Sequence, residues 1–350
     1  MEKSFRMELA GRPLIVETGK MAKQASGAVL VRYGETVVLV TSTASKEARE
    51  GMDFFPLTVD YEEKMYAVGK MPGGFLRREG RPGNSAILNA RLIDRPIRPL
   101  FDKRCRNDIH VMATVLSVDY DNAPELCGML GASASLGISD IPWDGPIAGV
   151  RVGRVDGKFV INPTQEQLKV STLNITVAGS ETAILMVEGG AQEAPEEDVL
   201  DAIMFGHETI KELVAFQKKI IEEVGKPKRT LIFPEIPEEI KTAIYAYAER
   251  PLKEAIFNPD KLTREAHMEE VRKEAEAHFK EIYPENGSDT AECLNHLTKE
   301  IVRHMISVDK IRPDGRALDE IRPISCEVGL LPRVHGSALF TRGQTQALTI

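Results

Sequence analysis

An internal repeat constrains the fold of this 350-residue chain more than any other feature of its sequence. The pattern Gly-x-x-Leu-x-x-x-Gly-x-Thr-x-x-Leu occupies residues 27–39 and returns at residues 336–348, a constant offset of 309. In both copies the second glycine separates two apolar runs, as the turn of a β-hairpin does. Upstream, Gly11-Arg12 and Gly315-Arg316 fit the same scheme with a small change in length. Identities in register within equivalent hairpin patterns favour a duplicated structural unit over a chance match.

The duplication predicts where the domains begin and end. A second copy of the first domain begins near Asp309 and continues for only about one hairpin. A lone hairpin is marginally stable in water, so we expect residues 337–350 to form strands that lack a partner. The chain is therefore expected to be the front half of a longer protein. We predict a first core domain at residues 1–230, an all-helical linker domain at 231–308, and the truncated start of a second core domain at 309–350.

The first part of the chain is predicted to be an α+β domain. Apolar runs within residues 27–41 flank the turn of the repeat, and residues 110–118 form a further β-type run. Residues 123–136 are rich in small side chains and are predicted to be a helix. We attribute Gly128 and Gly131 to close packing of this helix, because no Gly-Lys-Ser/Thr follows them as in a phosphate-binding loop. Further strands are expected at residues 147–152, 159–161, 173–177 and 183–188.

A helical pattern begins at Pro195. Proline suits the first turn of a helix, and the carboxylates that follow it favour the positive end of the helix dipole, so we predict a helix to about Val224 rather than a metal site. Residues 225–229 are a predicted turn or linker. From Pro237 to about Val308, apolar residues at three- and four-residue spacing predict helices that are interrupted near residues 284–287. The charges of this region predict a solvated face.

Composition excludes several classes of protein. A formal net charge of −8 and a pI of about 5.6 exclude a generally basic coat, so any contact with nucleic acid must be local. No apolar run approaches the length that spans a bilayer, and the first residues lack a signal-peptide core, which predicts a cytoplasmic protein without membrane contacts. The four cysteines are scattered without a Cys-x-x-Cys pair, which favours reduced thiols and argues against a zinc site.

Arginines gather in one place within this acidic chain. Eight of them fall within residues 75–106, opposed there by only three carboxylates: Glu79, Asp94 and Asp102. Such a local basic concentration is the electrostatic footprint expected for a polyanion that touches one place. The planar fork of arginine also grips phosphate oxygens in pairs, which suits an RNA backbone. Glycine and proline residues before and within residues 75–81 predict that this segment is a loop.

Two interpretations of the loop stay open. Arginine-rich stretches are commonly solvated faces or ion-pair networks. Against this, a loop that exposes Phe75 and Leu76 beside three arginines leaves apolar surface uncovered unless a ligand covers it. An aromatic ring flanked by cations is how proteins hold single strands, by base stacking together with neutralisation of the backbone.

Two motifs in this region resemble a known family. Residues 73–82, Gly-Gly-Phe-Leu-Arg-Arg-Glu-Gly-Arg-Pro, and residues 91–101, Arg-Leu-Ile-Asp-Arg-Pro-Ile-Arg-Pro-Leu-Phe, closely resemble the first core domain of polynucleotide phosphorylases. The family commonly has two adjacent phenylalanines where this chain has Phe75-Leu76, so a stacking role rests on Phe75 alone. The order of an α+β part, a helical part and the start of a repeat matches the family's plan. In that plan two ribonuclease-PH-like domains, of the ribosomal protein S5 domain 2-like fold, are joined by an all-helical domain.

The resemblance implies an activity. Polynucleotide phosphorylases are polyribonucleotide nucleotidyltransferases that act as 3′-to-5′ phosphorolytic exoribonucleases in mRNA degradation. Inorganic phosphate attacks the 3′-terminal phosphodiester of single-stranded RNA and releases a nucleoside diphosphate, with Mg²⁺ or Mn²⁺ as the divalent metal. Family members form a homotrimer around an RNA channel, and other RNA-degradation proteins are further expected partners.

The resemblance also implies where the sites lie. The phosphate-binding serines and the metal-binding carboxylates are expected in the second core domain beyond Ile350, so no catalytic or metal-binding residue is assigned within this chain. We therefore expect the chain alone to be inactive. RNA binding is implied for residues that resemble the lining of the channel aperture, and for two arginines of the second motif: Phe75, Arg77, Arg78 and Arg81, and then Arg95 and Arg98.

Structural roles remain open for part of this set. Arg95 and Arg98, with Asp94 nearby, are equally well explained as ion pairs that buttress the loop. At the start of the second copy, the roles of three charged residues are left open: Asp314, Arg316 and Arg322.

Two hypotheses of different classes follow. The first is an enzyme, a polynucleotide phosphorylase whose RNA-guiding half is this chain. The second is a non-catalytic module that threads RNA and assembles a ring. Ribonuclease PH itself is disfavoured, because it has one such domain and no helical insert followed by a repeat.

Overall fold

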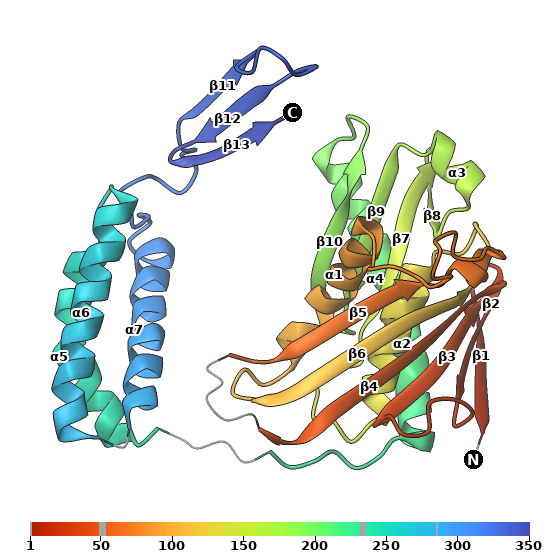
Figure 1. Ribbon diagram of the computed structural model, residues 1–350, viewed down its shortest axis with the longest axis horizontal. Coiled ribbons are helices and arrows are strands. Elements are labelled where there is room, and N and C mark those ends of the chain that lie inside the picture. The colour runs from red at the N-terminus through yellow and green to blue at the C-terminus, as the bar shows by residue number, and fades with distance from the viewer. Residues whose placement is uncertain (1, 49–53, 232–235, 285) are drawn as a thin grey trace. The chain divides into compact units, whose positions relative to one another are not determined.

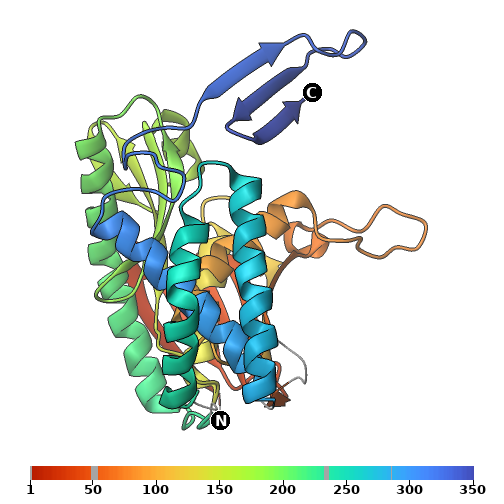
Figure 2. The same ribbon diagram turned by 90° about the vertical axis from the view of Figure 1, so that its left-hand side faces the viewer.

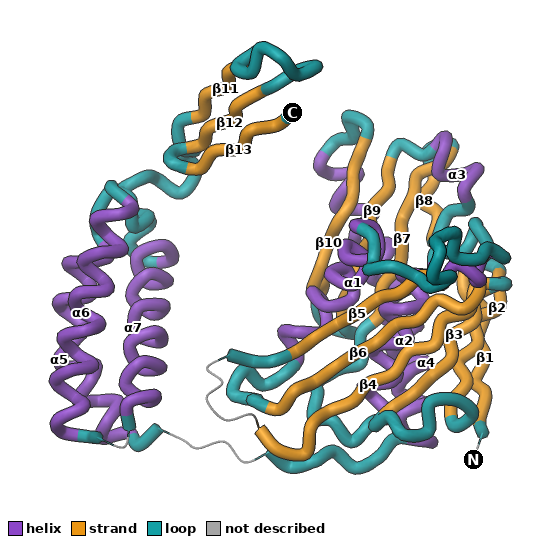
Figure 3. Tube along the Cα trace, viewed as in Figure 1, coloured by secondary structure: helices purple, strands orange, loops and turns teal. Residues whose placement is uncertain are grey.

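The computed structural model describes residues 2–48, 54–231, 236–284 and 286–350 (Figure 1). The chain divides into two compact units, Met1–Phe233 and Pro234–Ile350. The first unit combines two β-sheets with helices, and the second combines a group of helices with a small sheet (Figure 3). The α+β class predicted from the sequence is therefore confirmed.

A six-stranded sheet forms one layer of the first unit. Its strands are antiparallel neighbours except for the last pair, in which β5 runs parallel to β6. The predicted hairpin is β3–β4, and Gly34 at its turn has a φ of 58°, a conformation that glycine adopts without strain. The strands follow in the spatial order β1 (Lys3–Leu9), β2 (Arg12–Thr18), β3 (Gly27–Tyr33), β4 (Thr36–Ala48), β6 (Asn107–Ser117) and β5 (Leu57–Glu63).

A four-stranded antiparallel sheet forms the second layer. The four strand segments predicted beyond residue 140 all belong to it. A short helix, α3 (Gln165–Val170), begins with a capping box in which Thr164 and Gln167 satisfy each other's backbone N–H groups. The strand order is β10 (Ile184–Ala191), β9 (Leu173–Gly179), β7 (Ala148–Val155) and β8 (Lys158–Ile161).

Helix α2 (Pro124–Ile138) lies at the centre of the first unit and contacts both sheets. Its residues from Leu126 to Ile138 are all buried, as expected for a helix that is apolar on every side. The predicted close packing of its glycines is confirmed: a Cβ atom on Gly131 would lie 2.4 Å from Cγ2 of Val40, and one on Gly128 would lie 3.0 Å from Cδ1 of Ile93. Two further helices complete the unit, α1 (Asn84–Ile97) on β5 and α4 (Glu196–Val224) on the four-stranded sheet.

Lys228 ties the predicted turn after α4 to the end of α2. Its Nζ donates hydrogen bonds to the carbonyl oxygens of Leu136, Gly137 and Ser139, at 2.7, 2.9 and 2.8 Å. These carbonyls lie at the C-terminus of a helix, where a cation is favoured by the helix dipole and by the unpaired oxygens.

We expect Lys228→Met to lower the free energy of unfolding by about 1–3 kcal/mol, because three carbonyls lose a charged donor. Urea unfolding followed by circular dichroism measures the change. Lys219→Met on α4 is the matched control, since Lys219 is exposed and has no ion pair among the described residues. Equal stability of the two variants would contradict the capping role.

Three helices form the core of the second unit. The predicted helical region comprises α5 (Glu238–Ile256), α6 (Lys261–Ile282) and α7 (Gly287–Ser307), with the expected interruption between α6 and α7. Their buried side chains include Ile244, Leu252, Phe279, Leu294 and Leu297, at the spacing from which the helices were expected.

The start of the second copy contains one more strand than expected. Residues 337–350 were predicted to form an unpartnered hairpin, but β12 (Ala338–Arg342) pairs with β13 (Thr345–Thr349) on one side and with β11 (Ile324–Val328) on the other. The prediction missed β11 because its sequence, ISCEV, lies outside the repeated pattern. The order β11-β12-β13 repeats β2-β3-β4, and Gly343 has a φ of 62°, close to that of Gly34.

Candidate nucleic-acid interface

The arginine loop, residues 70–83, joins the 3₁₀ helix η1 (Met65–Val68) to α1. Gly69 ends η1 in the left-handed conformation with a φ of 70°, and Gly83 precedes α1 as its N-cap. Within the loop, the Arg77 N–H donates to the Gly74 carbonyl at 3.0 Å and closes a turn. The predicted loop at residues 75–81 is confirmed, and Figure 2 shows it in orange, projecting from the first unit.

The apolar side chains of the arginine loop point into solvent. Phe75 is 99% exposed, and Leu76 and Met71 are 73% and 71% exposed. An aromatic ring in this position loses no packing when it moves onto a planar partner. The expected uncovered apolar surface beside the arginines is therefore present.

Ion pairs divide the arginine cluster into two groups. Among the described residues, Arg77, Arg78 and Arg81 have no carboxylate partner. The second group lies outside the loop and forms ion pairs: Arg95 pairs with Glu188 of β10, and Arg98 pairs with Asp94. The guanidinium groups of the first group are therefore available to an anion on the loop, as is that of Arg91 on α1.

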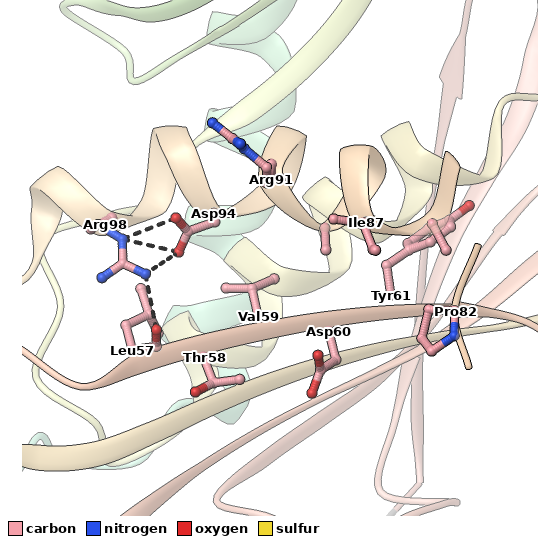
Figure 4. A pocket seen from close by; sticks show the side chains of 12 residues that line it. Leu57, Thr58, Val59, Asp60, Tyr61, Pro82, Ile87, Arg91, Asp94 and Arg98 are labelled. Atoms are coloured by element: carbon pink, nitrogen blue, oxygen red, sulfur yellow. Dashed lines mark hydrogen bonds and ion pairs between the residues drawn. The ribbon is translucent and has the colours of Figure 1, made fainter. Parts of the chain in front are cut away.

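Arg98 fastens α1 to the edge of the six-stranded sheet. Its Nη2 donates to Asp94 Oδ1 at 2.7 Å and to the Leu57 carbonyl of β5 at 2.9 Å. Its guanidinium carbon also lies 5.9 Å from the centroid of the Phe55 ring. Figure 4 shows this side chain bridging the helix and the strand. These contacts are those of the buttress that was one of the two explanations for Arg98.

A hollow of about 320 Å³ lies between side chains of β5 and α1. Asp60, Ile87 and Arg91 are among the residues that line it, and Figure 4 shows Arg91 directed away from β5. Arg91 is exposed and lacks an ion pair within the described residues, yet the sequence did not single it out. Recognising α1 as a helix would have drawn attention to Arg91, because Arg91 follows Ile87 by one helical turn and so shares its face.

Glu79 is the acidic residue inside the arginine loop. Its Oε1 accepts a hydrogen bond from the Met65 N–H at 2.9 Å, and its Oε2 lies 3.7 Å from Lys64 Nζ. Lys64 also donates to Glu62. That hydrogen bond, with the Coulombic attraction of Glu62 and Glu79, outweighs the effect of partial burial and raises the pKa of Lys64. The ammonium group that faces Glu79 is therefore charged at neutral pH.

The described residues do not form a metal centre. No group of three or more His, Cys, Asp or Glu side chains among them has the geometry to hold a metal ion. The carboxylates after Pro195 begin α4 as predicted, and Asp198 among them pairs with Arg154. In the part of the chain that the structure covers, no helix has the length and apolar character needed to cross a membrane.

Comparison with known families gives the class of the chain. Residues 10–142 match the model for domain 1 of the 3′ exoribonuclease family, and residues 145–209 match the model for domain 2 of that family. Residues 239–317 match a third model, described as the RNA binding domain of polyribonucleotide nucleotidyltransferase. The first unit therefore matches both domain models of the 3′ exoribonuclease family.

Similar curated proteins identify a more specific family within this class. The chain is 59% identical over 346 residues to the polyribonucleotide nucleotidyltransferase of Heliobacterium modesticaldum, and 58% and 57% identical over 348 residues to those of Syntrophomonas wolfei and Geobacillus kaustophilus. Each match covers 99% of this chain but only 48–50% of the relative. The chain belongs to the polyribonucleotide nucleotidyltransferase family, as its motifs indicated, and spans about half the length of these relatives.

The helical segment is the point at which the sequence interpretation and the family description differ. Its charge pattern predicts a solvated face, whereas the family model that matches it is named for RNA binding. In this chain each of α5, α6 and α7 carries one more acidic than basic side chain. Most of the lysines there face a glutamate on the same helix, such as Lys253 with Glu249 and Lys273 with Glu269.

Proposed function

We propose that the arginine loop binds single-stranded RNA, and that the chain is the RNA-guiding half of a phosphorolytic exoribonuclease. The observation that carries this proposal is the presence of three arginines without a carboxylate partner among the described residues, beside a phenylalanine ring that is 99% exposed. Guanidinium groups neutralise the RNA backbone, and the ring stacks on a base. Double-stranded RNA keeps its bases stacked inside the helix, so this arrangement favours a single strand.

The charge of the chain supports binding at one place. The net charge of −8 repels a polyanion from most of the surface, so attraction is expected to be strongest where unpaired arginines gather. The acidic excess on α5, α6 and α7 leads us to assign the phosphate contacts of this chain to the loop. Arg77, Arg78 and Arg81 are the proposed contacts, and Arg95 and Arg98 are proposed to support the loop from α1.

The chemistry of the whole protein is also a proposal. We infer 3′-to-5′ phosphorolysis with inorganic phosphate as co-substrate and Mg²⁺ or Mn²⁺ as the metal, acting in mRNA degradation in the cytoplasm. By resemblance to the family, we assign the phosphate and metal site to the second ribonuclease-PH-like domain. A homotrimer would bring three arginine loops to one aperture, where together they would present nine of these arginines to the strand.

The test of this division of labour is release of ADP from poly(A) by the 350-residue chain, with phosphate and Mg²⁺ supplied. We expect RNA binding without ADP release, because the proposed contacts hold the strand while the phosphate and metal site is assigned to the second ribonuclease-PH-like domain. The same result would fit the alternative of a non-catalytic module that threads RNA and assembles a ring. ADP release by the chain would place a working site within these residues and contradict the assignment.

A ring exchange tests the stacking role. Phe75→Leu is expected to lower the affinity for single-stranded poly(A) by about 1–3 kcal/mol, because the aromatic platform for one base is lost. Leu76→Phe is expected to raise the affinity, since its side chain is 73% exposed and has room for a ring. Fluorescence anisotropy with a labelled strand measures both variants. A loss of affinity in Leu76→Phe equal to that in Phe75→Leu would show that shape rather than stacking decides binding.

A further inference from the structure

Among the described residues, one side chain attaches the arginine loop to the rest of its unit by polar contacts. Among the described residues 71–82, only Glu79 makes a hydrogen bond or ion pair with a residue outside the loop. The ends of the loop are held by backbone hydrogen bonds, from the Lys70 N–H to the Met65 carbonyl at 3.0 Å and from the Ile87 N–H to the Gly83 carbonyl at 3.1 Å. Between these ends, the polar side-chain contacts of the described loop residues with the rest of the unit are those of Glu79.

The partner of Glu79 is itself fixed to the six-stranded sheet. Lys64 follows β5 directly, its N–H donates to the Val115 carbonyl of β6 at 3.4 Å, and its ammonium group is bound by Glu62. The Glu79 side chain is only 29% exposed, and a hollow of about 450 Å³ lined by Arg78 and Arg81 lies beside it. The attachment is therefore a partly buried contact with a rigid element, where an ion pair is screened less than at the surface.

We propose that Glu79 is a positioning residue, which holds the arginine loop against the end of β5 so that the arginines on either side of it are presented to RNA. The inference rests on the proposed function of the loop. Arg78 and Arg81 flank Glu79 in the sequence, so a fixed Glu79 restricts the directions in which both side chains extend. Ordering these side chains before RNA arrives removes part of the entropy cost of binding.

Charge and positioning predict opposite effects when Glu79 is replaced. Removal of a carboxylate beside three arginines makes the loop more positive, so charge alone predicts tighter binding of RNA. Loss of the attachment leaves the arginine side chains to be ordered by RNA, so positioning predicts weaker binding. The sign of the change therefore separates the two roles.

Two substitutions of Glu79 remove different parts of the attachment. Glu79→Ala removes both contacts, and we expect it to lower the affinity for single-stranded poly(A) roughly two- to tenfold. Glu79→Gln keeps an acceptor for the Met65 N–H and loses the ion pair with Lys64, so it is expected to recover part of the loss. Glu8→Gln on β1 is the control for charge, because Glu8 is exposed and has no ion pair within the described residues. Tighter binding by Glu79→Ala would overturn the proposal.

Limited trypsin digestion measures the attachment without reference to RNA affinity. Trypsin cleaves after Arg77 and Arg78, whereas the bond from Arg81 to Pro82 resists it. Because cleavage follows the population of open loop, Glu79→Ala should be cut at these sites several-fold faster than the unsubstituted chain. Each rate is divided by that of a synthetic peptide of the same sequence, since a glutamate beside the cleaved bond itself slows trypsin. An unchanged rate would overturn the inference about Glu79 even if the arginines bind RNA. If poly(A) fails to protect Arg77 and Arg78 in the unsubstituted chain, the proposed function of the loop fails instead.

Discussion

Replacing Arg77, Arg78 and Arg81 together by alanine is expected to weaken single-strand binding and to flatten its salt dependence. Each phosphate contact on a single strand contributes about 0.7 to the slope of log K against log salt, so three lost contacts reduce the slope by about 2. The guanidinium groups have no carboxylate partner among the described residues, so their removal leaves the fold intact. Titration of labelled poly(A) at several salt concentrations measures the slope.

The control for this variant removes the same charge elsewhere. Arg6, Lys20 and Lys23 are exposed residues of the first unit, and their replacement by alanine also lowers the net charge by three. If general electrostatic attraction holds the RNA, both triple variants will lose slope equally. If the arginine loop makes the contacts, only the loop variant will do so. An unchanged slope in the loop variant would remove these residues from the RNA path.

Gly27→Ala is expected to destabilise the first unit strongly. A Cβ atom at this position would lie 2.0 Å from the Ser135 carbonyl oxygen, which belongs to the backbone of α2. Because neither a strand backbone nor a helix backbone moves as easily as a side chain, the substitution forces β3 and α2 apart. We expect a loss of about 3 kcal/mol, at the upper end of the cost of overpacking a core.

Guanidinium unfolding followed by the fluorescence of Trp143 measures this loss. Trp143 is the single tryptophan of the chain, is 8% exposed and belongs to the first unit. Gly190→Ala on β10 is the matched control, because it is also a strand glycine of this unit and nothing lies within 4 Å of the added Cβ. It should change the stability by less than about 0.5 kcal/mol. A small effect of Gly27→Ala would contradict the close contact between β3 and α2.

The repeat explains why part of the fold was predictable. Gly27 and Gly34 recur as Gly336 and Gly343, and the structure gives a reason for each. Gly27 lies on a strand that α2 approaches closely, and Gly34 lies at a turn that needs a positive φ. Nothing lies within 4 Å of a Cβ on Gly336 in this chain. The helices of the second unit were predictable for another reason, because their apolar spacing is a local signal.

Elements that depend on distant partners were not predicted. β5 pairs in parallel with β6 across an intervening helix, and no local pattern marks such a pairing. α1 was not assigned, since its sequence contains Pro96 and several charged residues. β1, β2 and β11 were missed as well, because each is identified by its pairing with a neighbouring strand rather than by its own sequence.

The candidate site was likewise predictable only where its features depend on the local sequence. Glycine and proline residues predicted the loop, and composition predicted its charge, because both are properties of the local sequence. The separation of free arginines from paired ones was not predictable, since Glu188 pairs with Arg95 across 93 positions of the sequence. The role of Glu79 was hidden for the same reason: its partners are a backbone N–H and a lysine that precede the loop.

Photo-crosslinking tests the central claim most directly. A 4-thiouridine-containing single strand is bound to the 350-residue chain, irradiated and digested with trypsin, and the linked peptides are identified by mass spectrometry. We predict a crosslink at Phe75, in the tryptic peptide of residues 71–77, MPGGFLR. The crosslink should be lost in the triple arginine variant, in which the same residues lie in a longer peptide that ends at Arg91. Crosslinks confined to residues 239–317 would place the RNA on the helical segment instead and contradict the assignment to the loop.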